Sequence, residues 1–111
     1  MAVEIVSLEG KHPVEEPSYE FPLTHISAYA DATETVASVT WYVYDATALT
    51  NNIATTLVKA SGYGSDYVYV EIRNDTTGHS YIVAGVVTSS AGRKNVVAGR
   101  FTSYNLGVAL T

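Results

Sequence analysis

The sequence contains no cysteine, so neither disulfides nor thiol chemistry contribute to this chain of 111 residues. That absence fits a reducing cytosol or an assembly built there. Charged residues are also scarce, at 15% of the chain, whereas hydrophobic residues make up 47%. This composition is sufficient for a core and does not fit a largely disordered protein, so we expect one folded domain.

Long apolar runs are missing as well. None approaches the roughly 20 residues that a helix needs to span a bilayer. The N-terminus, MAVEIVSLEG, is acidic and lacks the uninterrupted apolar segment of a signal peptide. We therefore expect a soluble chain without a signal peptide and without membrane insertion.

The net charge of −5 is unevenly distributed along the chain. Residues 1–45 carry a balance of −7, and residues 46–111 a balance of +2. The two parts could attract each other within or between subunits, or the acidic part could simply be solvated. Free nucleic acid is a poor partner for a chain of this sign, because phosphate contacts need a basic face.

Proline is rare and confined to one stretch, since all three prolines lie between Gly10 and Pro22. Proline cannot donate to a β-ladder and favours extended backbone before it, so residues 1–22 are predicted to form an extended arm. The arm also contains Tyr19 and Phe21. We expect these aromatic residues to lie on a surface, either of this chain or of a neighbour.

The remaining sequence is rich in β-branched and aromatic residues and shows no sustained helical periodicity. Residues 2–8 form a candidate edge or arm strand, and Ser61–Ser65 a loop. Further strands are predicted over residues 23–30, 34–44, 53–60, 67–73, 80–88 and 94–103. About seven short strands with regular turn signals predict an immunoglobulin- or fibronectin III-like antiparallel β-sandwich over residues 23–104. A closed barrel is the alternative, and residues 105–111 are left as a C-terminal tail.

The stretch from Asp75 to Arg100 predicts a β-hairpin, because two β-rich segments flank a short turn that contains Gly92. Residues 80–88 are apolar on both parities, which is typical of a central strand with both faces covered. Tyr81 follows a glycine-bearing turn, as the tyrosine corner of immunoglobulin-like domains does. We expect Tyr81 to be a corner residue in the core.

Alternation over residues 34–44 assigns side chains to the two faces of one strand. Trp41 falls on the same parity as Val39 and Val43 and is predicted to be the central aromatic of the core. Tyr42 and Tyr44 then point outward. By the same reasoning, Tyr67 and Tyr69 point outward from the strand over residues 67–73.

No convincing catalytic set is apparent. The histidines His12, His25 and His79 lie in no metal-ligand spacing, and no G-x-S-x-G motif occurs. Glu15, Glu16 and Glu20 could converge as glycosidase carboxylates do, but an arm with three prolines would hold them poorly. We expect no catalytic residues, no metal site and no cofactor.

Four residues in predicted turns offer oxygen ligands for calcium. They form two pairs, Asp31 with Glu34 and Asn74 with Asp75. Asx side chains in turns more commonly bond to their own backbone, and we favour that role here.

Two groups of motifs carry a family resemblance. The first is Lys11-x-Pro13-x-Glu15, Tyr19 and Ala37–Trp41, and the second is Thr77–Tyr81 followed by Val87–Arg93. Over roughly residues 11–103 the chain resembles small immunoglobulin-like virion proteins encoded in the head–tail gene region of tailed phages and prophages. The resemblance implies a non-enzymatic tail or head–tail adaptor that is located in the virion after assembly in the host cytoplasm. It also implies other virion proteins or copies of itself as partners.

Outward aromatic residues are the most informative surface feature, since tyrosine is enriched at protein interfaces. The predicted interface consists of Tyr19, Phe21, Tyr42, Tyr44, Tyr67 and Tyr69. Cross-strand aromatic pairs that only stabilise the sheet are an equal alternative. The second functional hypothesis is a carbohydrate- or cell-surface-binding module in which the tyrosines stack on sugars, and an enzyme is a distant third.

Overall fold

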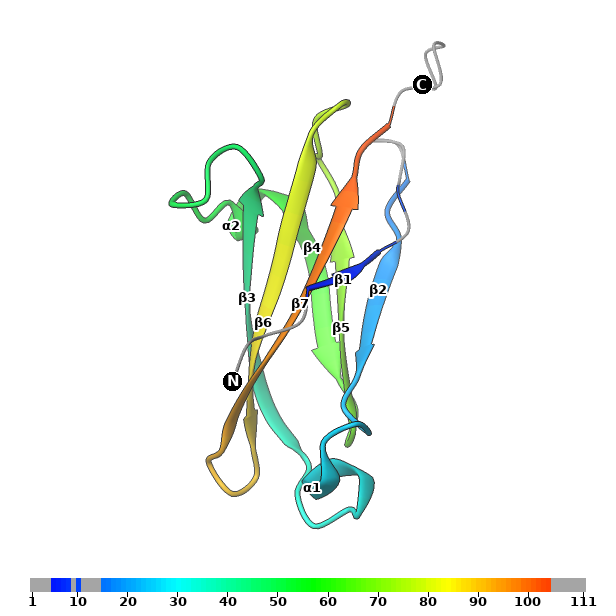
Figure 1. Ribbon diagram of the computed structural model, residues 1–111, viewed down its shortest axis with the longest axis vertical. Coiled ribbons are helices and arrows are strands. Elements are labelled where there is room, and N and C mark those ends of the chain that lie inside the picture. Colours follow the sequence, from blue (N-terminus) through cyan, green and yellow to red (C-terminus); the bar gives the residue numbers. More distant parts are fainter. Residues whose placement is uncertain (1–4, 9, 11–14, 105–111) are drawn as a thin grey trace.

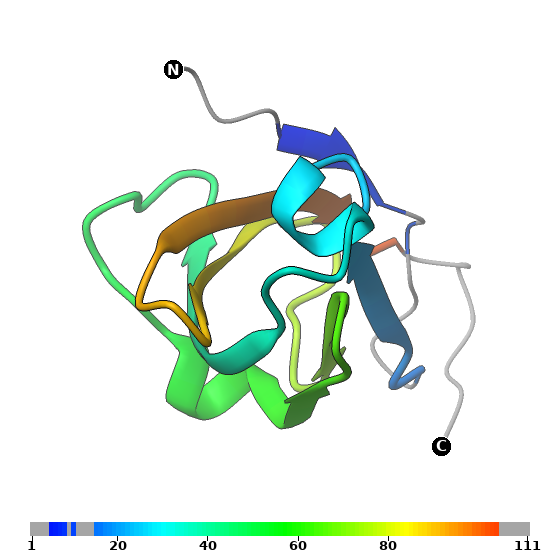
Figure 2. The same cartoon turned by 90° about the horizontal axis from the view of Figure 1, so that it is seen from below.

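Two β-sheets packed face to face make up the computed structural model, which describes residues 5–8, 10 and 15–104 (Figures 1 and 2). The predicted β-sandwich of about seven strands is therefore confirmed. The strands are β1 (Ile5–Ser7), β2 (Ser18–Pro22), β3 (Val36–Asp45), β4 (Val58–Tyr63), β5 (Tyr67–Ile72), β6 (Ser80–Ser89) and β7 (Lys94–Thr102). Two short helices, α1 (Ser27–Ala30) and α2 (Ala54–Leu57), lie in the connections.

One sheet has four strands in the order β1-β7-β6-β3, and the other has three in the order β2-β5-β4. Neighbouring strands are antiparallel except β1, which pairs parallel to β7 with Ile5 opposite Ala98. The expectation of a wholly antiparallel sandwich is wrong in this respect. A short parallel edge strand is possible here because β1 and β7 are far apart in sequence and need no tight turn between them.

The predicted hairpin is formed by β6 and β7. Its turn is closed by the Gly92 amide, which donates to the Ser89 carbonyl at 2.9 Å, and by the Ser89 amide, which donates to Arg93 at 2.8 Å. Gly92 has φ of +82°, a conformation that glycine adopts without steric cost. β6 is an inner strand, but its burial alternates, so one face is core and the other is only half-covered.

The core lies between the two sheets, and both predicted core residues belong to it. Trp41 and Tyr81 are 8% and 3% exposed. Phe21 packs on Trp41 with ring centroids 5.7 Å apart, and Tyr81 stacks on Phe101 at 5.3 Å. Because Phe21 comes from β2 and Trp41 from β3, the Phe21–Trp41 contact joins the two sheets.

Tyr81 also fixes the position of the segment that precedes β6. Its hydroxyl oxygen accepts a hydrogen bond from the backbone amide of Thr76 at 2.7 Å. A bond from the tyrosine hydroxyl to backbone a few residues upstream is the contact that defines a tyrosine corner. The immunoglobulin-like assignment itself stays a prediction.

The strand predicted over residues 23–30 is wrong. The chain forms β2 before this segment, at Ser18–Pro22, and then turns into α1 at Ser27–Ala30. Aromatic residues on one parity of β2 reach the core, whereas Pro22 lies at the end of an edge strand, where its missing amide costs nothing. The sandwich therefore includes residues that sequence patterning assigned to an arm.

The prediction for residues 53–65 is also partly wrong. Residues 54–57 form α2, with Leu57 buried, and the strand begins only at Val58. The strand then continues to Tyr63 through the predicted loop, because Gly62 pairs with Tyr69. Other predictions lie outside the described residues: Lys11-x-Pro13 with His12, and the tail over residues 105–111.

The free edge of β3 is partly covered by neighbouring loops. Near its end, the Val43 amide donates to Asn52 Oδ1 at 3.0 Å, and the Ile53 amide donates to the Val43 carbonyl at 2.8 Å. Near its start, the Tyr63 hydroxyl donates to the Ala37 carbonyl at 2.7 Å. Covering an edge in this way blocks unwanted strand pairing.

Candidate functional site

The outer face of the four-stranded sheet has an apolar centre, with Thr40, Thr88, Lys94 and Arg100 at its margins. We use the term docking face for six of its residues, all half-buried or exposed: Tyr42, Tyr44, Ile82, Ala84, Val86 and Val96. The sheet register places them side by side, since Tyr42 lies opposite Ala84 and Tyr44 opposite Ile82. Val86 lies opposite Val96, which is 46% exposed.

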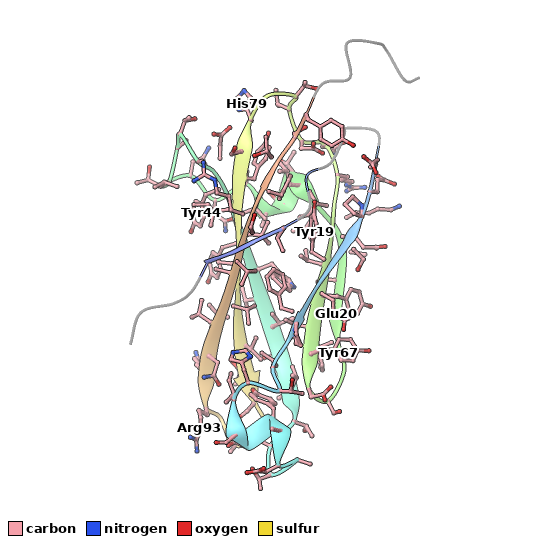
Figure 3. All side chains as sticks on the ribbon, turned by 45° about the vertical axis from the view of Figure 1, so that its right-hand side comes forward. Tyr19, Glu20, Tyr44, Tyr67, His79 and Arg93 are labelled. Atoms are coloured by element: carbon pink, nitrogen blue, oxygen red, sulfur yellow. The ribbon has the colours of Figure 1, made fainter. Side chains whose placement is uncertain are left out.

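The docking face has the chemistry of a protein interface. Its two tyrosines combine a large contact area with a hydroxyl, and the aliphatic side chains between them carry no charge. Figure 3 shows Tyr44 on the side of the sandwich opposite Tyr67. The two predicted pairs of outward tyrosines, Tyr42–Tyr44 and Tyr67–Tyr69, therefore belong to different faces.

Tyr67 and Tyr69 lie on the outer face of the three-stranded sheet, where both are half-buried. Each ring leans over a glycine: Tyr69 over Gly62 of β4, and Tyr67 over Gly64, which follows β4. A Cβ atom on Gly62 would lie 2.5 Å from the Tyr69 hydroxyl. Aromatic cover of an edge-strand glycine stabilises a sheet, so part of the role of both residues is structural.

Tyr19 and Phe21, in contrast, are not available to a partner. They are 7% and 5% exposed and face the core of this chain. Tyr19 stacks on Phe101 with ring centroids 5.5 Å apart. The predicted interface role of these two residues is therefore wrong, because β2 turns its aromatic parity inward and leaves Glu20 outside.

A groove of about 260 Å³ opens between the edge strands of the two sheets. Its walls come from β1, β2 and β7, and the segment after β2 adds His25. The lining residues are Val6, Glu20, Phe21, Pro22, His25, Val96, Val97 and Ala98. The groove is mainly apolar, with one carboxylate and one imidazole as its ionisable groups.

His79 and Asp45 form a close pair that the sequence did not indicate, because 34 positions separate them. His79 Nδ1 lies 2.5 Å from Asp45 Oδ2 at one end of the sandwich (Figure 3). Thr47 adds two bonds to Asp45 Oδ1, from its amide at 2.9 Å and its hydroxyl at 2.7 Å. The hydrogen bond from His79, followed by those from Thr47, lowers the pKa of Asp45 to about 2.

At the opposite end, a buried carboxylate fastens the β6–β7 turn. Glu34 is 8% exposed and accepts a 2.5 Å hydrogen bond from the Ser89 hydroxyl. Arg93 Nε lies 3.5 Å from the other Glu34 oxygen. Burial, and then the charge of Glu34, raises the pKa of the Tyr29 hydroxyl. This cluster orders the turn and the start of β3.

The glutamates of the predicted arm do not form a carboxylate pair. Glu16 accepts a 2.8 Å bond from Lys59, and this bond and the charge of Glu16 raise the pKa of Lys59. Glu15 accepts a bond from the Tyr104 hydroxyl at 3.1 Å. Glu20 lies on the outer parity of β2. The three carboxylates thus have separate surroundings.

One residue of each calcium-candidate pair has a protein partner. Glu34 bonds to Ser89, and the Asn74 side-chain amide donates to the Thr56 carbonyl at 3.2 Å. Among the described residues, no group of three or more His, Cys, Asp or Glu side chains could hold a metal ion. The described part of the chain likewise contains no helix long and apolar enough to cross a membrane.

Comparisons with known proteins add no further constraint. No protein-family model, curated protein or solved structure matches this chain.

Proposed function

We propose that the chain is a non-enzymatic structural or adaptor protein of a phage or prophage virion. It acts by protein–protein docking in the tail or head–tail region, through the docking face of the four-stranded sheet. Its partner there is a protein surface, either of a neighbouring virion protein or of a second copy of the chain. The sequence resemblance supports the virion setting, and the chemistry of the docking face supports the docking mode.

The observation that carries the proposal is the apolar character of the docking face. In a sheet with one solvated face, polar outward residues normally alternate with apolar core residues along each strand. Here adjacent outward positions on three strands hold two tyrosines, Ile82, Ala84, Val86 and Val96, and the polar outward residues Thr40 and Arg100 lie at the margins of this group. Contiguous exposed apolar surface of this kind is typical of interaction sites.

The fixed backbone beneath the two tyrosines of the docking face supports protein docking. Tyr42 and Tyr44 lie on β3, whose end is held by Asn52 and Ile53, so they stand on fixed backbone. Rigid aromatic anchors lose little conformational entropy on binding and commonly dominate interface energies.

Incorporation into particles tests the proposal. Tagged full-length chain is supplied during phage production, and purified virions are assayed for it by quantitative mass spectrometry. Val86→Lys places a charge on β6, the middle strand of the docking face, where binding would bury it without a partner. Leu49→Lys, at a loop position that is 59% exposed, is the matched control.

We expect the unmodified chain and Leu49→Lys in the particles, and Val86→Lys reduced about tenfold or more, with an unchanged melting temperature. Absence of the unmodified chain from particles would overturn the virion assignment. Equal incorporation of folded Val86→Lys would show instead that docking uses another surface.

A further inference from the structure

We propose that the outer face of the three-stranded sheet binds a neutral polysaccharide, whose sugar rings stack on Tyr67 and Tyr69. We use the term tyrosine platform for this site, which also includes Glu20 and Glu71. The site is separate from the docking face, since Tyr44 and Tyr67 lie on opposite sides of the sandwich (Figure 3). The inference therefore does not depend on the proposed function.

The two rings are held low on the sheet by the glycines beneath them. Gly62 lies directly opposite Tyr69, and the Gly64 amide donates to the Tyr67 carbonyl at 2.9 Å. Ring atoms of Tyr69 occupy the space where a side chain at Gly62 would stand, and those of Tyr67 the space where one at Gly64 would stand. With no side chain at either glycine, the Tyr69 ring leans across β4 and the Tyr67 ring across the turn that follows it.

Tyr67 and Tyr69 are adjacent outward residues of β5. They point to the same side of one strand, so their Cα atoms are separated by roughly 7 Å along it. Aromatic rings bind apolar faces through burial and dispersion, which gives the platform two adjacent stacking positions.

Two hydrogen-bond acceptors lie beside Tyr69. Glu20 lies directly opposite Tyr69 in the register, and Glu71 is the next outward residue of β5. Among the described residues, neither carboxylate has a hydrogen bond or a close ion pair, although Glu71 lies near enough to Lys59 to help raise the pKa of that lysine. Sugar hydroxyls are suitable donors for both, and bonds to an ionised acceptor are strong.

The same carboxylates define which glycans fit. Glu20 and Glu71 disfavour uronic or sialic acids next to Tyr69, since the Lys59 ammonium near Glu71 is already paired with Glu16 at 2.8 Å. They also distinguish this site from the docking face, because charged residues are depleted at the core of protein interfaces. A neutral, polyhydroxylated chain satisfies both the rings and the acceptors.

Nuclear magnetic resonance titration of the full ¹⁵N-labelled chain tests the inference. The probes are cellohexaose and chitohexaose as neutral chains, and a hyaluronan hexasaccharide as the anionic comparison. With at least one neutral probe we expect saturable shifts at Gly62, Gly64 and the amides of β5. The anionic probe should bind about tenfold more weakly or not at all.

Variants separate stacking from general surface contact. Tyr67→Leu and Tyr69→Leu still cover the glycines but lack a flat aromatic face, so each should weaken binding about three- to tenfold. Tyr67→Phe and Tyr69→Phe should retain most of the affinity. Tyr44→Leu, the same change on the opposite face, is the matched control and should have no effect.

Three results would overturn the inference. They are no saturable shift with either neutral probe, shifts centred on Tyr42 and Tyr44, and a loss in Tyr44→Leu as large as in Tyr69→Leu. The first two are measured on the unmodified chain, so they remain decisive even if a leucine variant fails to fold. None of these results bears on incorporation into particles.

Discussion

The indole ring of Trp41 lies directly across from Gly85 on β6, where a Cβ atom would be 2.9 Å from Trp41 Cζ3. The same relation occurs on the outside of the other sheet, where tyrosine rings lean over Gly62 and Gly64. In each case, the glycine has no side chain, and an aromatic ring occupies the space where a side chain would lie.

Gly85→Ala should destabilise the protein by about 1–3 kcal/mol, because a methyl group there overpacks against a ring that the core holds in place. Chemical denaturation measures the free energy of unfolding. In a Trp41→Phe background, the smaller ring leaves room, so Gly85→Ala should cost less. Strictly additive effects of the two changes would contradict the steric explanation.

Trp41→Ala should cost roughly 3–5 kcal/mol, since it removes a large buried side chain that contacts Phe21 from the other sheet. Among the described residues, Trp41 Nε1 has no hydrogen-bond partner. Trp41→Phe should therefore lose packing without losing a bond and should be milder. A melting temperature that is unchanged in Trp41→Ala would show that this contact does not stabilise the fold.

Ser89→Ala should destabilise by about 1.5–3 kcal/mol, because the Ser89 hydroxyl donates to the buried Glu34 carboxylate at 2.5 Å. It also accepts from the amides of Ala91 and Arg93, each at 3.2 Å. Ser90→Ala, which removes only the acceptor for the Thr35 amide, is the control and should cost less than about 1 kcal/mol. Thermal unfolding of the two variants side by side decides the matter, and equal losses would argue against the Glu34 contact.

Stability should depend on Asp45 at low pH. Its pKa falls from 3.8 to about 2 in the folded protein, so the folded state favours the ionised form. The resulting stabilisation is fully present above pH 3.8 and is lost as the pH falls through about 2. Asp45→Asn should reduce the slope of melting temperature against pH in this window.

The cause of the Asp45 shift can be tested at its partner. His79→Gln removes the largest contribution, so the pKa of Asp45, followed by the carboxyl ¹³C signal, should rise toward 3.8. Thr47→Val, which retains the backbone amide bond and loses the hydroxyl bond, should give a smaller rise. No change in either variant would show that the close pair does not hold the carboxylate in solution.

Local patterns predicted the strands whose two faces differ. β5 alternates between outward Tyr67, Tyr69 and Glu71 and inward aliphatic residues, and its bounds were predicted within one residue. The β6–β7 hairpin was also predicted correctly, because Gly92 marks its turn. Both signals are local: side-chain alternation and turn residues can be recognised within a few positions of the sequence.

Only part of the candidate surfaces could be predicted from the sequence. Parity correctly placed Tyr42, Tyr44, Tyr67 and Tyr69 outside, but it could not assign the two pairs to different sheets. Composition placed Tyr19 and Phe21 in a proline-rich arm, whereas sheet pairing with β5 buries them. The His79–Asp45 pair has no sequence signal, since strand pairing alone brings its members together.

The sequence by itself determined that the chain is a β-sandwich, which strands are amphipathic and that Trp41 belongs to the core. Those properties follow from side-chain periodicity and turn chemistry, which are local. Only the tertiary structure decided on which outer face each tyrosine lies, which glycines make room for aromatic rings and where β2 begins. Those outcomes depend on contacts between distant strands, where burial outweighs the local preferences of a short segment.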